Sequence, residues 1–270
     1  MVEQAACKDT AGRYQAIVLH DLNSLASEDT RPKTLHRLRT HLRRLQAYLE
    51  LVGEEANAKL IADCVSRFSP LRTLQVLDAY LAKLEAPDSD LQAVLDRIQA
   101  RRERLARTHV YRDVERLVRR HAIPPVPVGQ EWLAQRMNHL RELNGIALRE
   151  LALKASEQPR RKTLHLLRLK IKSVRYQEEW ALHEASARPD MVAWLKHAQS
   201  VLGEYEERVQ FRKLGRKLKL TCTKLIERDW RRARRRARAL PAKLIEKLKT
   251  FSPTGLRLVK SDRLDSGVAV

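Results

Sequence analysis

The sequence has few cysteines, glycines and aromatic residues, and it has no long apolar run. Its three cysteines, Cys7, Cys64 and Cys222, lie far apart and in no ligand spacing, so they predict neither a disulfide framework nor a zinc site. Only 8 glycines and 5% aromatic residues, beside abundant Leu, Ala, Arg and Glu, favour an all-α fold. No apolar stretch approaches the ~18 residues that cross a membrane, and the first residues lack the pattern of a signal peptide. We therefore expect no membrane insertion and a reducing, cytoplasmic compartment.

Catalytic signatures are also missing. The chain has no P-loop, GxGxxG, GxSxG or HExxH motif, and no acid pair suited to magnesium and phosphoryl transfer. His36 and His41 are five residues apart, which places them on different faces of a helix, and no Cys/His cluster is present. The sequence predicts no catalysis, no cofactor and no bound metal.

Basic residues outnumber acidic ones, and the excess lies late in the chain. The sequence has 54 Lys and Arg against 33 Asp and Glu, a formal net charge of +21. Residues 1–128 hold 21 bases and 17 acids, a net charge of +4, whereas residues 129–270 hold 33 and 16, a net charge of +17. A solvated helix face normally mixes the two signs, so this excess indicates an anionic partner. The competing interpretation is that it only keeps the protein soluble.

One helical pattern occurs twice. Residues 34–49 read TLHRLRTHLRRLQAYL, and residues 163–178 read TLHLLRLKIKSVRYQE. At about 100° per residue, the apolar residues of each stretch form one stripe, which we expect to face a core. The stripes consist of Leu35, Leu38, Leu42, Leu45 and Leu49, and of Leu164, Leu167, Ile171 and Val174. The repeat distance of 129 residues far exceeds the ~20 to 50 residues of a solenoid, so it predicts an internal duplication.

A row of basic residues runs beside each apolar stripe rather than opposite it. The rows are His36, Arg39 and Arg43 in the first copy and His165, Arg168, Lys172 and Arg175 in the second. Side chains that border a core line a groove or cavity, whereas charges that only aid solubility point away from it. Two basic rows therefore predict an anion-binding site. For the two histidines, a hydrogen-bonded structural role is the alternative.

Both patterns resemble the motifs of a known family. H-x-x-R-x-x-x-R-R-L from His36 and H-x-x-R-x-x-x-K-x-x-R-Y from His165 are similar to the CHAD domain, the conserved-histidine α-helical domain, whose members bind inorganic polyphosphate. Residues 70–74 and 195–203 resemble two further segments of that family, and the resemblance covers about residues 14–212. The chain departs from the family pattern at Gln46, Thr73, Gln75 and Ser173, and at Glu206 and Glu207, which stand in place of Asn-Asp.

The resemblance implies a non-catalytic module that binds inorganic polyphosphate in a basic groove and associates with polyphosphate or storage granules. Together with the basic rows, it selects the candidate binding residues. They are Lys33, His36, Arg39, Arg43, Arg44, Arg72, Lys162, His165, Arg168, Lys172, Arg175, Tyr176, Lys196, Arg208 and Arg212.

Helix breakers divide the chain into two similar four-helix bundle units, which we expect to face each other around a basic cavity. The expected divisions are residues 1–121 for the first unit, 122–130 for a Pro-rich linker, 131–251 for the second unit and 252–270 for a flexible tail. Together they would form one CHAD domain.

Within the units, the sequence predicts particular helix boundaries. Pro32 begins the first motif helix, and residues 91–121 form one long helix. In the second half we expect an interruption at Gly203, a long basic helix over residues 205–240 and a stop at Pro241.

Nucleic acid is the alternative partner. Residues 231–238, RRARRRAR, form a run that neutralises phosphates without reading bases. No aromatic residue interleaves with this run, which argues against stacking on single strands. The open choice is between polyphosphate in the groove and non-specific nucleic-acid binding through the arginine-rich helix.

Overall fold

The described part of the chain is made of helices and short connections. The computed structural model describes residues 4–27, 31–123, 130–181 and 188–251, and over these residues it has ten helices and no strand. The helices are α1 (Gln4–Ala26), α2 (Pro32–Leu51), α3 (Glu55–Arg67), α4 (Ser69–Lys83), α5 (Asp88–Arg107), α6 (Val110–His121), α7 (Gln130–Glu157), α8 (Arg161–Ala181), α9 (Pro189–Leu218) and α10 (Thr223–Phe251). The predicted all-α class is confirmed.

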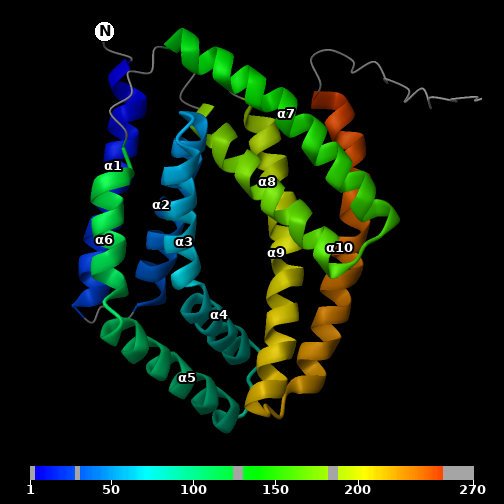
Figure 1. Cartoon of the computed structure of the whole chain (residues 1–270). Helices are drawn as coiled ribbons and strands as arrows, with labels where there is room; N and C mark the ends of the chain where they lie inside the picture. The colour runs from blue at the N-terminus through cyan, green and yellow to red at the C-terminus, as the bar shows by residue number, and fades with distance from the viewer. Residues whose placement is uncertain (1–3, 28–30, 124–129, 182–187, 252–270) are drawn as a thin grey trace, which may run out of the picture.

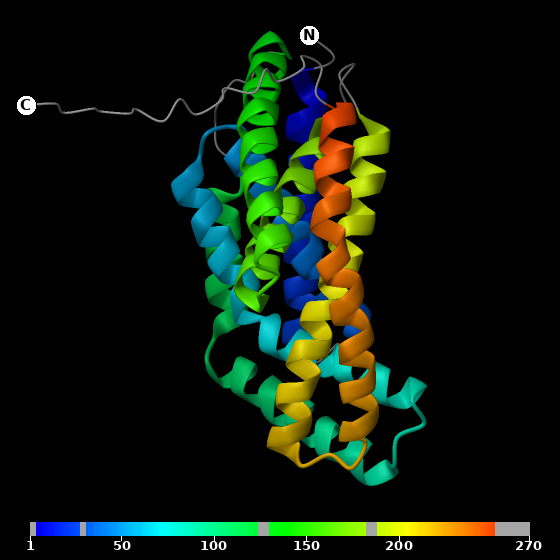
Figure 2. The same cartoon turned by 90° about the vertical axis from the view of Figure 1, so that its right-hand side faces the viewer.

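The helices form two groups of four (Figure 1). In one group α1, α2, α3 and α6 pack around one another, and in the other α7, α8, α9 and α10 do so. The remaining helices, α4 and α5, cross one end of the molecule, where α5 leads into α6 and α4 reaches α9. Seen from the side, the longest helices run along the long axis of the molecule (Figure 2). The two motif helices, α2 and α8, are in contact.

Both predicted apolar stripes are buried. The five leucines of the α2 stripe have no exposed surface, and neither do Leu167 and Ile171 of α8. Burying one such side chain stabilises the fold by roughly 1.5–3 kcal/mol. The core of the first group also includes Tyr176 and Trp180 of α8 and Phe211 of α9. The two groups therefore share buried apolar surface.

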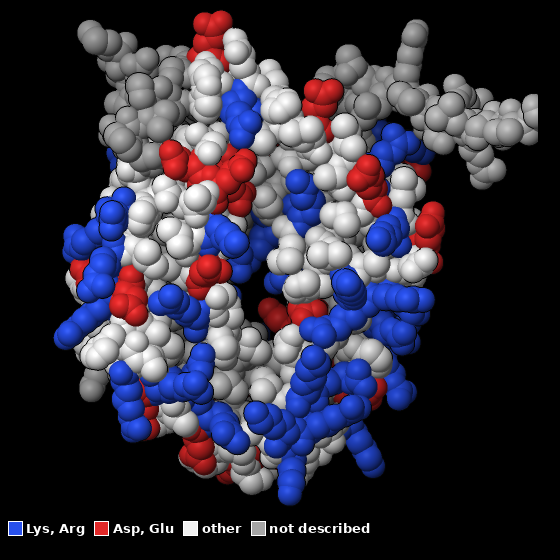
Figure 3. All heavy atoms as spheres, in the orientation of Figure 1, with Lys and Arg blue, Asp and Glu red and all other residues white. Residues whose placement is uncertain are grey.

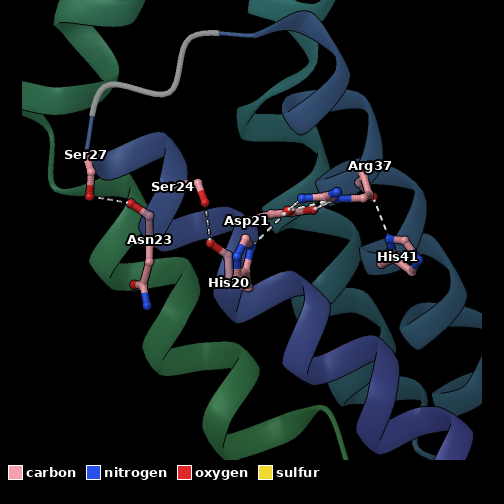
Figure 4. A network of polar contacts seen from close by, with 7 residues as sticks. All are labelled: His20, Asp21, Asn23, Ser24, Ser27, Arg37 and His41. Atoms are coloured by element: carbon pink, nitrogen blue, oxygen red, sulfur yellow. Dashed lines mark hydrogen bonds and ion pairs between the residues drawn. The ribbon is translucent and has the colours of Figure 1, made fainter.

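A buried carboxylate fastens α1 to α2 (Figure 4). Asp21 has no exposed surface, and its two oxygens each lie 2.9 Å from Nε of Arg37, which donates to them. One turn further along α2, Nδ1 of His41 lies 2.9 Å from the carbonyl oxygen of Arg37. A fully buried charge requires such a partner. The ion pair thus holds α1 against the motif helix α2.

The prediction of one helix over residues 91–121 is wrong. The chain forms α5 and α6 instead, separated by Thr108 and His109. His109 has a φ of 49°, a left-handed conformation that interrupts the helical path. Neither residue is Gly or Pro, so the sequence has no strong signal for this break. The break lets α6 return along α1 and α3.

The helix ends predicted at Gly203 and Pro241 are also wrong. α9 runs through Gly203, and α10 runs through Pro241 to Phe251. Gly203 is buried beside α8, and Leu240 and Leu244 on either side of Pro241 belong to the core of the second group. Packing at these positions overrides the weak helix propensity of Gly and Pro. The basic helix predicted over residues 205–240 is therefore two helices, α9 and α10.

The turn between α9 and α10 is held by a residue of the first half of the chain. Lys219 ends α9 with a φ of 55°. The buried Asp90 carboxylate of α5 accepts hydrogen bonds from the backbone N–H groups of Thr221, at 2.9 Å, and Cys222, at 3.0 Å. Although burial opposes ionisation, these bonds lower the pKa of Asp90. A long-range contact therefore sets this helix end.

The predicted start of the first motif helix is confirmed, since α2 begins at Pro32. Helix α4 likewise begins at Ser69, directly before Pro70. Most of the predicted Pro-rich linker and the whole C-terminal tail lie outside the described residues, so the four predicted divisions stay predictions. None of the described helices has both the length and the apolar character needed to cross a bilayer.

Candidate functional site

The surface is hollowed between the two helix groups. Figure 3, in the orientation of Figure 1, shows an opening at the centre of this face with Lys and Arg atoms inside it. Helices α2 and α4 lie on one side of the opening, and α8 and α9 lie on the other (Figure 1). Five cations from three of these helices interact electrostatically, and we call them the cation cluster. They are Arg39 and Arg43 of α2, Arg72 of α4, and Arg168 and Lys172 of α8.

Arg39 and Arg43 extend from successive turns of α2, beside the buried leucines. Burial and then the charge of Arg43 lower the pKa of Arg39 to about 10, and burial likewise lowers the pKa of Arg43. Nη2 of Arg39 donates to Oγ of Ser69 at 3.2 Å, whereas its Nε is buried without a hydrogen-bond partner. An unmet buried donor costs about 1–3 kcal/mol unless a ligand satisfies it.

Lys172 and Arg168 extend from α8 toward the same space. Burial, followed by the charges of Arg43, Arg168 and Arg39, lowers the pKa of Lys172 to about 5. The surroundings therefore oppose its charged form, and a bound anion would favour that form. Nε of Arg168 is buried without a hydrogen-bond partner. Gly203 of α9 lies next to this nitrogen, because a Cβ added to the glycine would be 3.8 Å from it. The guanidinium of Arg168 therefore lies against α9.

His36, the motif histidine of the first copy, borders the cation cluster. Partial burial and the charges of Arg72, Arg39 and Lys172 lower its pKa. The two histidines of α2 have different surroundings. His41 is buried against α1, whereas His36 is exposed. An anion bound near His36 would favour its charged form.

Glu207 of α9 adds one carboxylate to these surroundings. Its side chain is exposed at the surface, but the protein around the carboxylate reduces its solvation and raises its pKa, and the charges of Arg208, Arg168 and Arg72 oppose that rise. Among the described side chains, Arg168 and Lys172 have no acidic group within 4 Å, and the same holds for Arg43. One carboxylate beside five basic residues leaves the cation cluster with an excess of positive charge.

Two glutamates at equivalent positions of the repeat join α2 to α8. Glu50 accepts a hydrogen bond of 3.2 Å from the hydroxyl of Ser173. Glu179, located 129 residues later, accepts one from Arg175 of its own helix and lies 3.9 Å from Nε of Arg44 on α2. The candidate residue Arg44 is thus part of the contact between the helices.

Arg175 and Tyr176, both candidate residues, are buried beside the cation cluster. Nε of Arg175 donates to Gln199 of α9 at 2.9 Å, and its guanidinium carbon lies 4.0 Å from the ring centre of Tyr176. Tyr176 also interacts electrostatically with Arg39 and Arg43. These two residues therefore position the cluster.

His165, the motif histidine of the second copy, faces an acid. Its Nδ1 lies 3.7 Å from Oε2 of Glu206, and Arg161 donates to the other oxygen of that carboxylate at 2.7 Å. Burial opposes ionisation of Glu206, but the bonds from Arg161 and Gln210 lower its pKa. His165 thus has a counter-ion that His36 lacks among the described residues.

The remaining candidates lie farther along α9 or at the surface. The guanidinium of Arg208 lies 4.1 Å from the ring centre of Tyr80, and that of Arg212 lies 3.8 Å from the ring centre of Trp230. Arg212 also pairs with Glu227 at 2.5 Å. Besides His36, three candidates have exposed side chains: Lys33, Lys162 and Lys196.

Sequence reasoning missed two participants in the site. Glu207 stands in the Glu206-Glu207 pair that departs from the family pattern, and this departure was the available signal. Ser69 gave no signal, because its contact with Arg39 joins different helices. Within the described ranges, no group of three or more His, Cys, Asp or Glu side chains is arranged to hold a metal ion.

Comparisons with known proteins agree with this fold. The family model of the CHAD domain matches residues 11–216, which is most of the chain, and the chain belongs to that family. It is similar to the crystal structure of the CHAD domain from the plant Ricinus communis, with a TM-score of 0.60 and 18% identity over 92% of this chain and 90% of that one. This likeness concerns the fold alone. A search of curated proteins gave no match.

Proposed function

We propose that this protein binds inorganic polyphosphate in the cation cluster and acts as a binding or tethering module without catalysing a reaction. CHAD domains occur broadly in polyphosphate-related proteins. In this chain the support comes from cations that α2, α4 and α8 hold around one opening.

The observation that carries the proposal is the excess of positive charge in the cluster. Burial and the neighbouring arginines lower the pKa of Lys172 to about 5, which means that the free protein resists placing a further charge there. Like charges held together destabilise a fold. A bound polyanion neutralises that repulsion and gives the buried Nε donors of Arg39 and Arg168 the acceptors they lack.

The chemistry of the side chains favours a chain of phosphates. Guanidinium groups present several donors in a rigid fork, which suits closely spaced phosphate oxygens. Helices hold these groups in place before binding, so little side-chain entropy is lost. A single extended phosphate chain enters an opening between helices, whereas a duplex carries its phosphates on a broad convex surface.

The residue types of the cluster support binding rather than catalysis. The cluster consists of arginines and one lysine, with His36 at its border, and phosphoryl transfer additionally needs acids that hold magnesium near the phosphates. A tethering module of this kind would act in the cytoplasm, on polyphosphate or storage granules.

The test is a competition at physiological salt. Long-chain polyphosphate and a duplex DNA are titrated into the full chain, and we expect the polyphosphate to bind more tightly at equal phosphate concentration. Arg168→Ala should weaken polyphosphate binding, whereas Arg97→Ala, which removes an exposed arginine of α5, should not. Equal binding of both polyanions, or equal effects of both substitutions, would contradict the proposal.

Non-specific nucleic-acid binding is the second candidate, and the exposed face of α10 favours it. Five of the six arginines between residues 231 and 238 are exposed. Removing this helix is no test, because Ala233, Ala237 and Leu240 are buried in the core of the second group. Replacing Arg232 and Arg238 by Gln should instead lower the salt dependence of DNA binding, by about 0.9 for each phosphate that the variant no longer neutralises. Unchanged DNA binding would remove this candidate.

A further inference from the structure

A second basic concavity lies at the far end of α9, where this helix meets the start of α10. Its volume is about 610 Å³, within the range of ligand pockets. Lys and Arg atoms gather at this end of the molecule in Figure 3. We call it the α9–α10 pocket, and its basic lining residues are Arg212, Arg216, Lys224, Arg228, Arg231 and Arg235.

Rigid elements build this pocket. A Cβ added to Gly215 would lie only 3.3 Å from Cδ1 of Ile226, so the glycine lets the two helices approach closely. The turn between them is fixed by the Asp90 carboxylate. On α10 the four basic lining residues recur at intervals of three or four, which places them on one helix face. The pocket is therefore preformed, with cations on both walls.

The pocket has little negative charge to balance its cations. Glu227 is the one acidic lining residue, and it pairs with Arg212 at 2.5 Å and approaches Arg231 at 3.8 Å. Arg216, Lys224 and Arg235 have no acidic group within 4 Å in the part of the chain that the structure describes. Three uncompensated cations in one concavity favour a ligand with several negative charges.

A row of arginines connects this pocket to the cation cluster. Arg208, Arg212 and Arg216 of α9 recur at intervals of four residues, which keeps them on one side of the helix. Glu207, next to the first of them, interacts electrostatically with Arg208 and also with Arg168 and Arg72 of the cluster. At 1.5 Å per residue, the row from Arg208 to Arg216 spans about 12 Å. The row therefore runs from the surroundings of the cluster to the pocket.

We propose that the α9–α10 pocket is a second phosphate-binding subsite, which long inorganic polyphosphate occupies together with the cation cluster. The inference rests on the proposed function above. A short chain reaches the cluster alone, whereas a long chain follows the arginine row into the pocket. Cations on two walls of a concavity surround a single chain of phosphates, whereas a duplex would contact only the rim.

The test compares two variants that lose the same three charges. The pocket variant carries Arg216→Ala, Lys224→Ala and Arg235→Ala, and the control carries Arg232→Ala, Arg238→Ala and Lys243→Ala, which remove exposed residues outside the pocket. Calorimetric titrations at physiological salt use tripolyphosphate and long-chain polyphosphate. We expect the pocket variant to lose about tenfold in affinity for the long chain, the scale of one charge-assisted contact, and less than twofold for tripolyphosphate. The control should change less than twofold for both.

Three results would overturn the inference. They are equal behaviour of the two variants, an equal loss of tripolyphosphate and long-chain binding in the pocket variant, and a loss of duplex DNA binding as large as that of the long chain. Arg168→Ala separates this inference from the proposed function, because unchanged binding in that variant contradicts the cation cluster and not the pocket. If circular dichroism shows that the triple variant is unfolded, Lys224→Glu replaces it, since an acid in the first turn of α10 favours the helix.

Discussion

The two motif helices, α2 and α8, carry matched residues that meet across the interface between the helix groups. Arg39 and Arg168, and likewise Arg43 and Lys172, stand 129 residues apart in the sequence, and all four join the cation cluster. The predicted repeat thus appears as a set of matched contacts. Its origin by duplication stays a prediction.

The glutamates show the same relation in detail. Glu50 accepts from Gln46 of its own helix at 2.8 Å and from Ser173 of the other helix. Glu179 has Arg175 of its own helix and Arg44 of the other as partners. Each glutamate therefore has one partner four residues before it and one at the equivalent position across the interface, and Glu50 also accepts from Gln177 at 3.1 Å. Position in the repeat decides the contact even where the donor residue differs.

The histidines and the helix ends differ between the copies. His36 lies among cations, whereas His165 lies 3.7 Å from Glu206. Leu51 is buried within the first group, whereas its equivalent, Trp180, belongs to the second motif helix but packs in the core of the first group. Equivalent positions can therefore have different roles, and one of them joins the two groups.

The largest expected effect tests that difference. The Trp180 ring meets Tyr14 edge-on and is tilted against Tyr48, and its Nε1 donates to the carbonyl oxygen of Arg44 at 3.1 Å. Trp180→Ala should lower the free energy of unfolding by about 3–5 kcal/mol, as for other buried aromatic residues. Urea unfolding measures this change. Trp132→Ala, at a position that is 43% exposed, is the control and should change it by less than about 0.5 kcal/mol. A similar loss of unfolding free energy in both variants would show that Trp180 does not join the two helix groups.

The second prediction concerns Lys172, which stands at the position of α8 that is equivalent to Arg43 of α2. The folded-state pKa of Lys172 is about 5, below the ~10.4 of an unfolded chain, so the unfolded state binds more protons between these values. Stability should therefore rise with pH across this window. Lys172→Met removes this contribution and should stabilise the protein at pH 7 by a few kcal/mol, on the scale of ~1.4 kcal/mol per pKa unit. Urea unfolding at pH 6 to 9, without phosphate, tests it. Parallel pH profiles of the two proteins would contradict the lowered pKa.

The third prediction asks whether both copies bind. Arg39→Ala and Arg168→Ala should each weaken binding of long-chain polyphosphate by about 1.5–3 kcal/mol, the value of a hydrogen bond to a charged group. Because each substitution removes a like charge from the cluster, thermal stability should not fall. Titration and thermal unfolding of the same samples measure both effects. A large loss of polyphosphate affinity in only one of the two variants would show that only one copy binds.

The smallest expected effect separates the two histidines. An anion raises the lowered pKa of His36, so binding takes up protons and should strengthen two- to threefold as pH falls from ~7.5 to ~6, near the unperturbed pKa of histidine. His36→Gln should reduce this dependence. His165→Gln should retain it, because Glu206 rather than the ligand faces that ring. An equal loss of the pH dependence in both variants would show that the two histidines have equivalent roles.

Local pattern was sufficient for several features of this protein. The period of the leucines predicted the buried stripes of α2 and α8, and Pro32 predicted the start of α2. The position of the basic rows beside those stripes predicted side chains at the border of the core, where Arg39 and Arg168 lie. These features depend on residues within a few turns of one helix, which the sequence displays directly.

The sequence by itself therefore determined the helical class, the apolar stripes and the cationic residue types of the site. The tertiary structure decided where helices break and which charges are balanced. The end of α9 depends on Asp90, about 130 residues away, and α9 passes through Gly203 because that helix packs against α8. Likewise, only the fold brings Glu206 close to His165 and places His36 near Arg72. A helix end or a pKa depends on groups brought together from distant parts of the chain, and local propensity carries no information about them.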